Sequence, residues 1–124
     1  LEINARQIRV EDGGTISTAS GTAALNRVFV SSGTGGSLTL NATDEIRLEV
    51  NGTQGSTSVI STNTFGSANA GSITLNTRRF VTSGRALVAA STFATGRGGE
   101  ITINASESVE ISGDPSDFFG VGTN

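Results

Sequence analysis

The side chains in this sequence that could do chemistry are acidic residues and arginines. The acidic candidates are Asp44, Glu45, Glu49, Glu107 and Glu110. Two neighbouring carboxylates can hydrolyse a glycosidic bond when one is the acid and the other the base or nucleophile. Arg9 and Arg47 could hold an acidic sugar beside them. The charges recur at corresponding places along the chain, however, and this favours a solvated face. We therefore predict no catalytic residue and no enzyme.

The amino-acid composition argues against several further kinds of binding and catalysis. The 124 residues include no His and no Cys, the net charge is −3, and every basic residue is Arg. The chain thus lacks the commonest general base and metal ligand, and its charge is a poor match for nucleic acid. Asp12-Gly13-Gly14 is typical of a turn, and Asp114 with Asp117 is weak evidence for an ion site. We predict no cofactor and no metal. No apolar run approaches the ~18 residues of a membrane span.

The elements that position these charged residues should be organised by a short sequence motif, here called the phrase, which recurs four times. Its copies are Leu1–Ala5, Leu38–Ala42, Ile73–Thr77 and Ile101–Ala105. Each copy alternates apolar and polar residues and has Asn in fourth place, and the starts at 1, 38, 73 and 101 are 37, 35 and 28 residues apart. Alternation indicates a half-buried strand, and self-similarity at this spacing indicates a stacked repeat architecture.

Two further strand signals follow each copy. The second strands are expected at 8–10, 46–48, 80–82 and 109–111, and the third strands at 16–20, 60–65 and 88–93. In the fourth repeat the third strand is predicted to be missing or degenerate, within an irregular tail at 114–124. Phe118 and Phe119 in that tail either cover the end of the core or begin a loop. Extra residues at 23–32 and 51–58 are expected to form loops, and almost no helix is expected.

Three short strands per repeat, each followed by a turn, predict a right-handed parallel β-helix. We expect about three to four coils, all strands parallel, in a single segment covering residues 1–124. The chain starts inside a repeat, so we expect it to be a fragment of a longer one. Apolar residues should stack in rows between coils. The recurrent residues Asn4, Asn41, Asn76 and Asn104 should stack where the chain turns sharply, since Asn tolerates the left-handed conformation.

Two other rows follow from aligning the repeats. Phe65 and Phe93 end the third strands of neighbouring repeats and should stack with ring centroids ~4.5–7 Å apart. The residues two positions before the second strands are Arg6, Asp44, Arg78 and Glu107. Their signs alternate, so they are predicted to form a surface row of attracting charges that fixes the register of the coils, with Glu45 beside Arg79 as a second pair.

The phrases at 71–79, 91–93 and 99–113 resemble the repeat of filamentous-haemagglutinin-like exoproteins, particularly the large cyanobacterial ones. The resemblance covers nearly the whole chain except 23–32 and the tail. It implies a right-handed β-helical stalk of a secreted adhesin from a two-partner secretion system, located outside the cell or on its surface. It also implies surface glycans or an outer-membrane secretion protein as partners. The domain that guides export is not recognisable.

Two functions of different classes remain open. The first is a structural stalk or filament segment, whose ends contact another copy or a continuation of the same polymer. The second is a carbohydrate-active β-helix that binds or cleaves an acidic polysaccharide. A groove lined by converging carboxylates would favour the second function, and a smooth sheet would favour the first.

Overall fold

The computed structural model describes residues 1–20, 22–24, 27–29, 33, 35–52, 55–113 and 120–123, and within them the protein is all-β with no helix. The strands are β1 (Glu2–Glu11), β2 (Thr15–Ser20), β3 (Thr22–Ala24), β4 (Arg27–Phe29), β5 (Leu38–Glu49), β6 (Ser58–Thr64), β7 (Ile73–Ser83), β8 (Ala86–Thr92), β9 (Ile101–Ile111) and β10 (Gly120–Thr123). The absence of helix in this part of the chain agrees with the sequence, which has no extended 3.6-residue apolar period.

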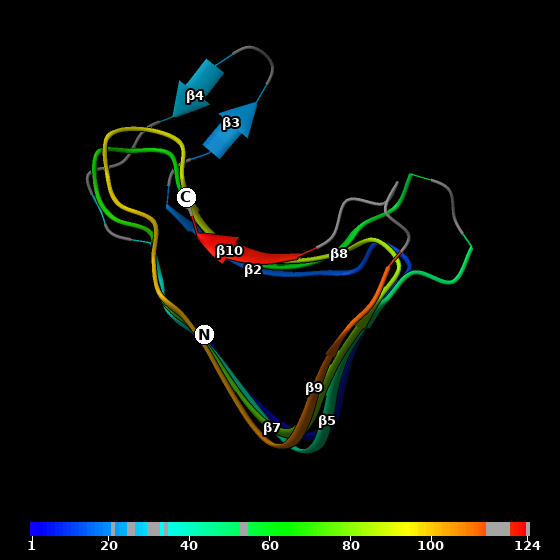
Figure 1. Cartoon of the computed structure of the whole chain (residues 1–124). Coiled ribbons are helices and arrows are strands. Elements are labelled where there is room, and N and C mark those ends of the chain that lie inside the picture. Colours follow the sequence, from blue (N-terminus) through cyan, green and yellow to red (C-terminus); the bar gives the residue numbers. More distant parts are fainter. Residues whose placement is uncertain are drawn as a thin grey trace.

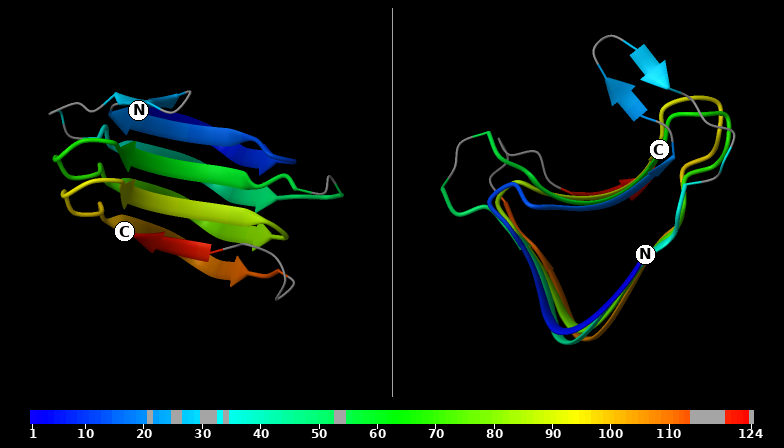
Figure 2. Two further views of the ribbon diagram at one scale, coloured as in Figure 1. Left: turned by 90° about the horizontal axis from the view of Figure 1, so that it is seen from above. Right: turned by 180° about the vertical axis from the view of Figure 1, so that it is seen from behind.

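The strands form two four-stranded parallel sheets between which the chain alternates. The long-strand sheet has the order β1-β5-β7-β9, and the short-strand sheet has the order β10-β8-β6-β2. In Figure 1 the long strands bend into a V, and the short strands lie across its open side. Figure 2 shows the strands of both sheets following one another in sequence order from one end of the stack to the other. Every recurring phrase pairs in parallel with its neighbour, as predicted.

Two expectations about individual strands were wrong, and a third had left two alternatives open. The first two strand signals of each repeat form one long strand, since β1, β5, β7 and β9 continue through both. Of the missing or degenerate third strand expected in the fourth repeat, the structure has the degenerate one, because the short β10 pairs with β8 and aligns Val121 with Val88. Not all strands are parallel, because β3 and β4 form an antiparallel hairpin within the insertion of the first repeat. The hairpin projects from the stack beside β2 (Figure 1).

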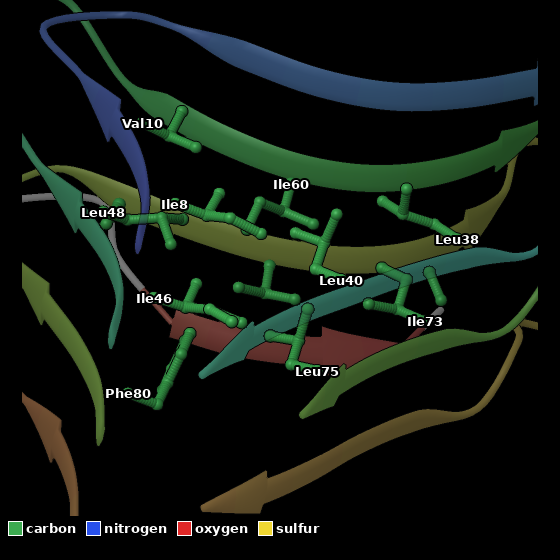
Figure 3. Packing of buried hydrophobic residues seen from close by; sticks show 14 residues of the cluster. Ile8, Val10, Leu38, Leu40, Ile46, Leu48, Ile60, Ile73, Leu75 and Phe80 are labelled. Carbon is green, nitrogen blue, oxygen red and sulfur yellow. The ribbon is translucent and has the colours of Figure 1, made fainter. Parts of the chain in front are cut away.

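The core lies between the two sheets and is built from rows of equivalent side chains. Leu40 pairs with Leu75 and Ile46 with Phe80, and all four are fully buried. Figure 3 shows these side chains pointing into the space between the sheets, where Ile60 meets them from β6. Full burial of one such side chain stabilises the fold by ~1.5–3 kcal/mol. Because apolar and polar residues alternate along the phrase, every second side chain points into the core.

Turns between the sheets are close-packed around glycine. A Cβ added to Gly71 would lie 2.3 Å from the carbonyl oxygen of Gly36 and 2.6 Å from that of Gly35. The backbone of one repeat therefore touches that of the next, and no side chain fits between them. Thr62 binds the same turn, because its Oγ1 donates to the carbonyl oxygen of Gly71 at 2.6 Å. The close approach of the two backbones explains why glycine stands just before the recurring phrase.

Candidate functional site

The four recurrent asparagines form a hydrogen-bonded row on the long-strand sheet, here called the Asn row (Asn4, Asn41, Asn76 and Asn104). The Nδ2 of Asn41, Asn76 and Asn104 each donates to the Oδ1 of the asparagine one repeat earlier, over 2.7, 2.7 and 2.8 Å. At the β1 end of the Asn row, the Oε1 of Glu2 accepts hydrogen bonds from the Nδ2 of both Asn4 and Asn41, each at 3.2 Å. The spacing of the phrase predicted this contact between neighbouring repeats, and Glu2 was missed.

The Asn row does not occupy a sharp turn, so that part of the prediction was wrong. Each asparagine lies inside a strand and pairs with the next in register. Within the described residues, Asp12 is the one non-glycine with positive φ, at 46°. Asp12 caps a turn, because its Oδ1 accepts from the backbone N–H of Asn51 at 2.8 Å. The asparagines therefore act through their amide groups in extended backbone.

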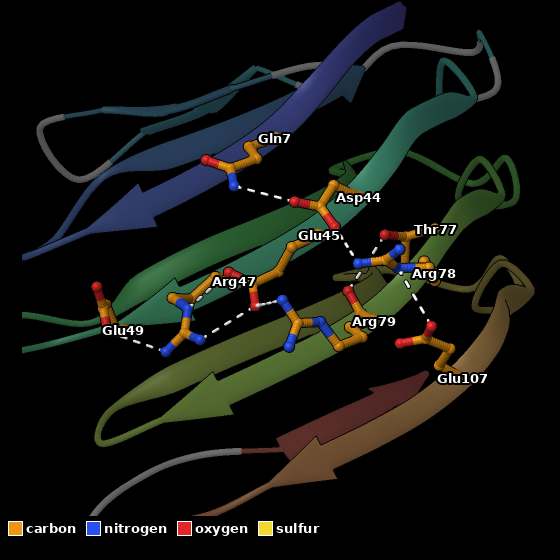
Figure 4. A network of polar contacts seen from close by, with 9 residues as sticks. All are labelled: Gln7, Asp44, Glu45, Arg47, Glu49, Thr77, Arg78, Arg79 and Glu107. Carbon is orange, nitrogen blue, oxygen red and sulfur yellow. Dashed lines mark hydrogen bonds and ion pairs between the residues drawn. The ribbon is translucent and has the colours of Figure 1, made fainter.

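The predicted row of alternating charges is here called the charge row (Arg6, Asp44, Arg78 and Glu107). Arg78 joins its two neighbours, with Nη2 2.7 Å from Oδ1 of Asp44 and Nε 3.4 Å from Oε1 of Glu107. Arg6 makes no ion pair with Asp44 in the described part of the chain. Instead the side-chain amide of Gln7 donates to Oδ2 of Asp44 at 3.2 Å (Figure 4). Two of the three predicted steps are thus ion pairs, and the third is replaced by an amide.

Each strand pairing of the long-strand sheet has an irregularity at the charge row. The pairing of β1 with β5 shifts between Ala5 and Gln7, where one residue of β1 faces two of β5, and that of β7 with β9 shifts in the same way after Thr77. The strands β5 and β9 therefore carry one more residue here than β1 and β7. Such bulges bend a strand and redirect its side chains. The members of the charge row lie in the segments where the aligned pairing is interrupted.

Glu45 is the centre of a second cluster, next to the charge row. Arg47 donates two hydrogen bonds to its carboxylate, from Nε at 2.9 Å and from Nη2 at 3.1 Å. Arg79 approaches the same group at 3.6 Å, as expected from the sequence, and Arg47 also lies 3.7 Å from Glu49. The Glu45 side chain is only 5% exposed. The hydrogen bonds from Arg47, with the charges of Arg47 and Arg79, hold the pKa of Glu45 below its usual range despite the opposing effect of burial.

Asp44 also favours its charged form. The hydrogen bond from Gln7 is the main cause that lowers the pKa of this carboxyl, and the charges of Arg78, Arg79 and Arg6 lower it further. A general acid for glycoside hydrolysis needs the opposite, because it must hold a proton near neutral pH. The two most constrained carboxylates of the sheet are therefore set up to stay ionised and paired.

Phe65 and Phe93 stack as predicted. Their ring centroids are 4.9 Å apart, and the planes are inclined by 9°. The backbone N–H of Phe93 donates to the carbonyl of Thr64 at 2.9 Å, which aligns the two rings one above the other. Phe93 is 65% exposed, so its ring covers that of Phe65 on one face and meets solvent on the other.

A shallow hollow of about 370 Å³ opens on the outer surface of the long-strand sheet. Its lining is Asn41, Ala42, Thr43, Asn76, Thr77, Arg78 and Ser106. No carboxylate lines it. Within the described ranges no three acidic side chains gather as a metal site would require. Asp114 and Asp117, considered for an ion, and Phe118 and Phe119, considered for the end of the core, lie outside the described residues.

Comparison with known proteins gives no relative for this chain: no family model, no curated protein and no solved structure matches it. Among the described elements there is no helix of the length and apolar character that crossing a membrane demands.

Proposed function

We propose that this chain is a right-handed parallel β-helix serving as a structural, non-catalytic segment of a secreted or cell-surface filament of the adhesin type. The observation that carries the proposal is the Asn row, in which one residue type recurs in register on four successive strands. A hydrogen-bonded row of this kind gains one more bond with each added repeat. Such a unit is built for extension by stacking.

The order of strands supports the helical part of the proposal. The chain leaves the long-strand sheet, enters the short-strand sheet and returns to pair in parallel with the strand that it left one repeat earlier. Connections between parallel strands of one sheet are right-handed in nearly all proteins, because strand twist favours that hand. A right-handed coil therefore accounts best for the alternation between two parallel sheets.

The state of the acidic residues supports a structural role over the carbohydrate-active alternative. Glu45 is held by Arg47, and Asp44 is held by Gln7 and Arg78. A lowered pKa in both groups suits permanent ion pairs and opposes proton donation. The hollow beside them is lined by amide and hydroxyl side chains, Ala42 and Arg78. The charges thus serve the contact between repeats.

The proposed location outside the cell draws on the resemblance of the repeats to filamentous-haemagglutinin-like exoproteins. In that setting the exposed polar rows would contact surface glycans, and an outer-membrane secretion protein would export the chain. A long stack with a polar outer surface suits a spacer that holds a binding region away from the cell.

Two measurements test this proposal. An antibody raised against the chain should label intact cells of the source organism, and labelling that appears only after permeabilisation would contradict the location. The purified chain should release no reducing sugar from a panel of acidic polysaccharides such as polygalacturonate and alginate. Release by the wild-type chain that is lost in the Asp44→Asn and Glu45→Gln variants would establish the carbohydrate-active alternative.

A further inference from the structure

An asparagine followed by glycine lies in the turn just after β5 ends at Glu49. Asn51 and Gly52 are both exposed there, and within these 124 residues no other asparagine has glycine after it. The side-chain carbon Cγ of an asparagine is an electrophile, and the next backbone nitrogen can close a five-membered ring on it. Glycine favours this reaction because it has no side chain to hinder the approach of its nitrogen.

The fold leaves both reacting groups of this pair free. Neither the side-chain amide of Asn51 nor the backbone N–H of Gly52 makes a hydrogen bond with any residue that the structure describes. Gly52 has φ 133°, and a Cβ added to it would meet nothing within 4 Å. The described surroundings therefore place no obstacle in the way of ring closure.

Asp12 and Gly13 form a second pair that can close the same ring, but here the turn engages both groups. The Oδ1 of Asp12 accepts from the backbone N–H of Asn51 at 2.8 Å, and the backbone N–H of Gly13 donates to Oγ of Ser58 at 3.3 Å. A Cβ on Gly13 would also lie 3.3 Å from Cβ of Ser56, so this turn is closely packed. The fold thus holds one pair in place and leaves the other open.

We propose that Asn51 is a site of spontaneous deamidation, at which the chain changes covalently as it ages. The Gly52 nitrogen loses its proton to solvent base and bonds to Cγ of Asn51. The bond from Cγ to Nδ2 then breaks, and the side-chain nitrogen takes up a proton and leaves as ammonia. Water opens either carbonyl of the resulting succinimide and yields aspartate or isoaspartate at position 51. Water is the only co-reactant, and nothing is oxidised or reduced.

The product places a new negative charge beside Asp12. The new carboxylate stands on the residue whose backbone N–H binds Oδ1 of Asp12, and like charges this close repel each other. Isoaspartate also lengthens the backbone by one carbon at the same point. Because the backbone N–H of Asp12 donates to the carbonyl of Glu49 at 3.0 Å, this turn joins the first repeat to the second. Deamidation should therefore loosen that contact.

Incubation of the full chain at mildly alkaline pH, followed by peptide mapping with mass spectrometry, tests the inference. The peptide that contains Asn51 should gain the mass difference between a hydroxyl and an amino group. A methyltransferase specific for isoaspartate should label position 51 in the native chain, and position 12 only in the chain unfolded in urea. Asn51→Gln should abolish the conversion, since the longer side chain cannot form the five-membered ring. Gly52→Ala should slow it severalfold, because a methyl group hinders the attacking nitrogen.

Asn69→Gln is the matched control, because Asn69 is also exposed but is followed by Ala70. This variant should convert at position 51 as the wild type does. Conversion of Asn51 no faster than that of Asn69 would overturn the inference, as would a native chain in which position 51 converts far more slowly than in urea. Circular dichroism verifies the fold of each variant, and Asn51→Gln has no side-chain hydrogen bond to lose. The outcome is independent of surface labelling and of polysaccharide cleavage, so it leaves the proposed function untouched.

Discussion

The side-chain amide of Asn76 donates to the Oδ1 of Asn41 across neighbouring strands, at 2.7 Å. Asn76 also accepts from Asn104 at 2.8 Å, so it makes two bonds within the Asn row. Its position is therefore different from that of Asn104, which makes one. The half-buried Asn76 amide donates through its Nδ2 and accepts through its Oδ1, so one side chain bonds the neighbours on both sides.

Replacing Asn76 by Ala should therefore destabilise the protein more than replacing Asn104 by Ala. Loss of two hydrogen bonds at Asn76 should lower the free energy of unfolding by ~1–3 kcal/mol, and loss of one at Asn104 by ~0.5–1.5 kcal/mol. Urea denaturation followed by circular dichroism measures both. Equal effects of the two variants would contradict the expectation that stability depends on the number of hydrogen bonds lost.

The stacked rings of Phe65 and Phe93 should be energetically coupled. We expect Phe65→Ala and Phe93→Ala to give a double variant less destabilised than the sum of the single variants, with a coupling free energy of ~0.5–1.5 kcal/mol. Because Phe93 is 65% exposed, most of its effect should come through Phe65. Thermal unfolding of the four proteins in the cycle measures the coupling, and strict additivity would contradict it.

The rows could be predicted from sequence because each depends on spacing alone. Apolar alternation and the recurring Asn placed Leu40 on Leu75 and Asn41 on Asn76 without further information. The only sign of the bulge in the sequence is a difference in spacing: Ile8 follows Asn4 by four residues, whereas Ile46 follows Asn41 by five. One additional residue interrupts the alternation of apolar and polar residues, but it does not show whether the strand ends there or continues through a bulge.

Other features depended on side-chain direction or on weak patterns. Gln7, and not Arg6, reaches Asp44, because the bulge in β5 lies opposite these two residues and the sequence does not show which of them faces Asp44. Arg47 and Glu45 are two residues apart on one strand, and residues at that spacing point to the same face of a sheet. Their contact could therefore have been predicted from the sequence. The strand β10 has one apolar residue, Val121, between glycines, and its sequence therefore carries almost no strand signal.

The carboxylate of Glu45 should make stability fall in acid. Its pKa is lowered in the folded protein from an ordinary value of 4.5, chiefly by hydrogen bonds from Arg47. The stabilisation is therefore complete above pH 4.5 and is lost as the pH falls through the folded pKa. Glu45→Gln should lower the free energy of unfolding by ~1–2 kcal/mol at pH 7 and flatten its decline below pH 4.5.

Urea midpoints measured from pH 7 to pH 3 provide this comparison. Glu110→Gln is the control, because Glu110 is exposed and makes no ion pair within the described residues. This control should follow the wild-type curve. If the free energy of unfolding of Glu45→Gln falls in acid as steeply as that of the wild type, other carboxylates, Asp44 first among them, dominate the loss of stability at low pH.

The turn at Gly71 should tolerate no side chain, whereas Gly36 beside it should accept one. A Cβ on Gly71 would lie 2.3 Å from the carbonyl oxygen of Gly36, and backbone on both sides prevents that oxygen from moving away. A Cβ on Gly36 would meet Thr18 at 3.5 Å, an ordinary van der Waals contact. Gly71→Ala should therefore cost ~3 kcal/mol or more, and Gly36→Ala should change stability by less than ~1 kcal/mol. Urea denaturation of the two variants distinguishes a steric requirement at one position from a general preference for glycine in the turn. Equal destabilisation by both would show that backbone freedom, and not the close approach of neighbouring repeats, explains the glycines.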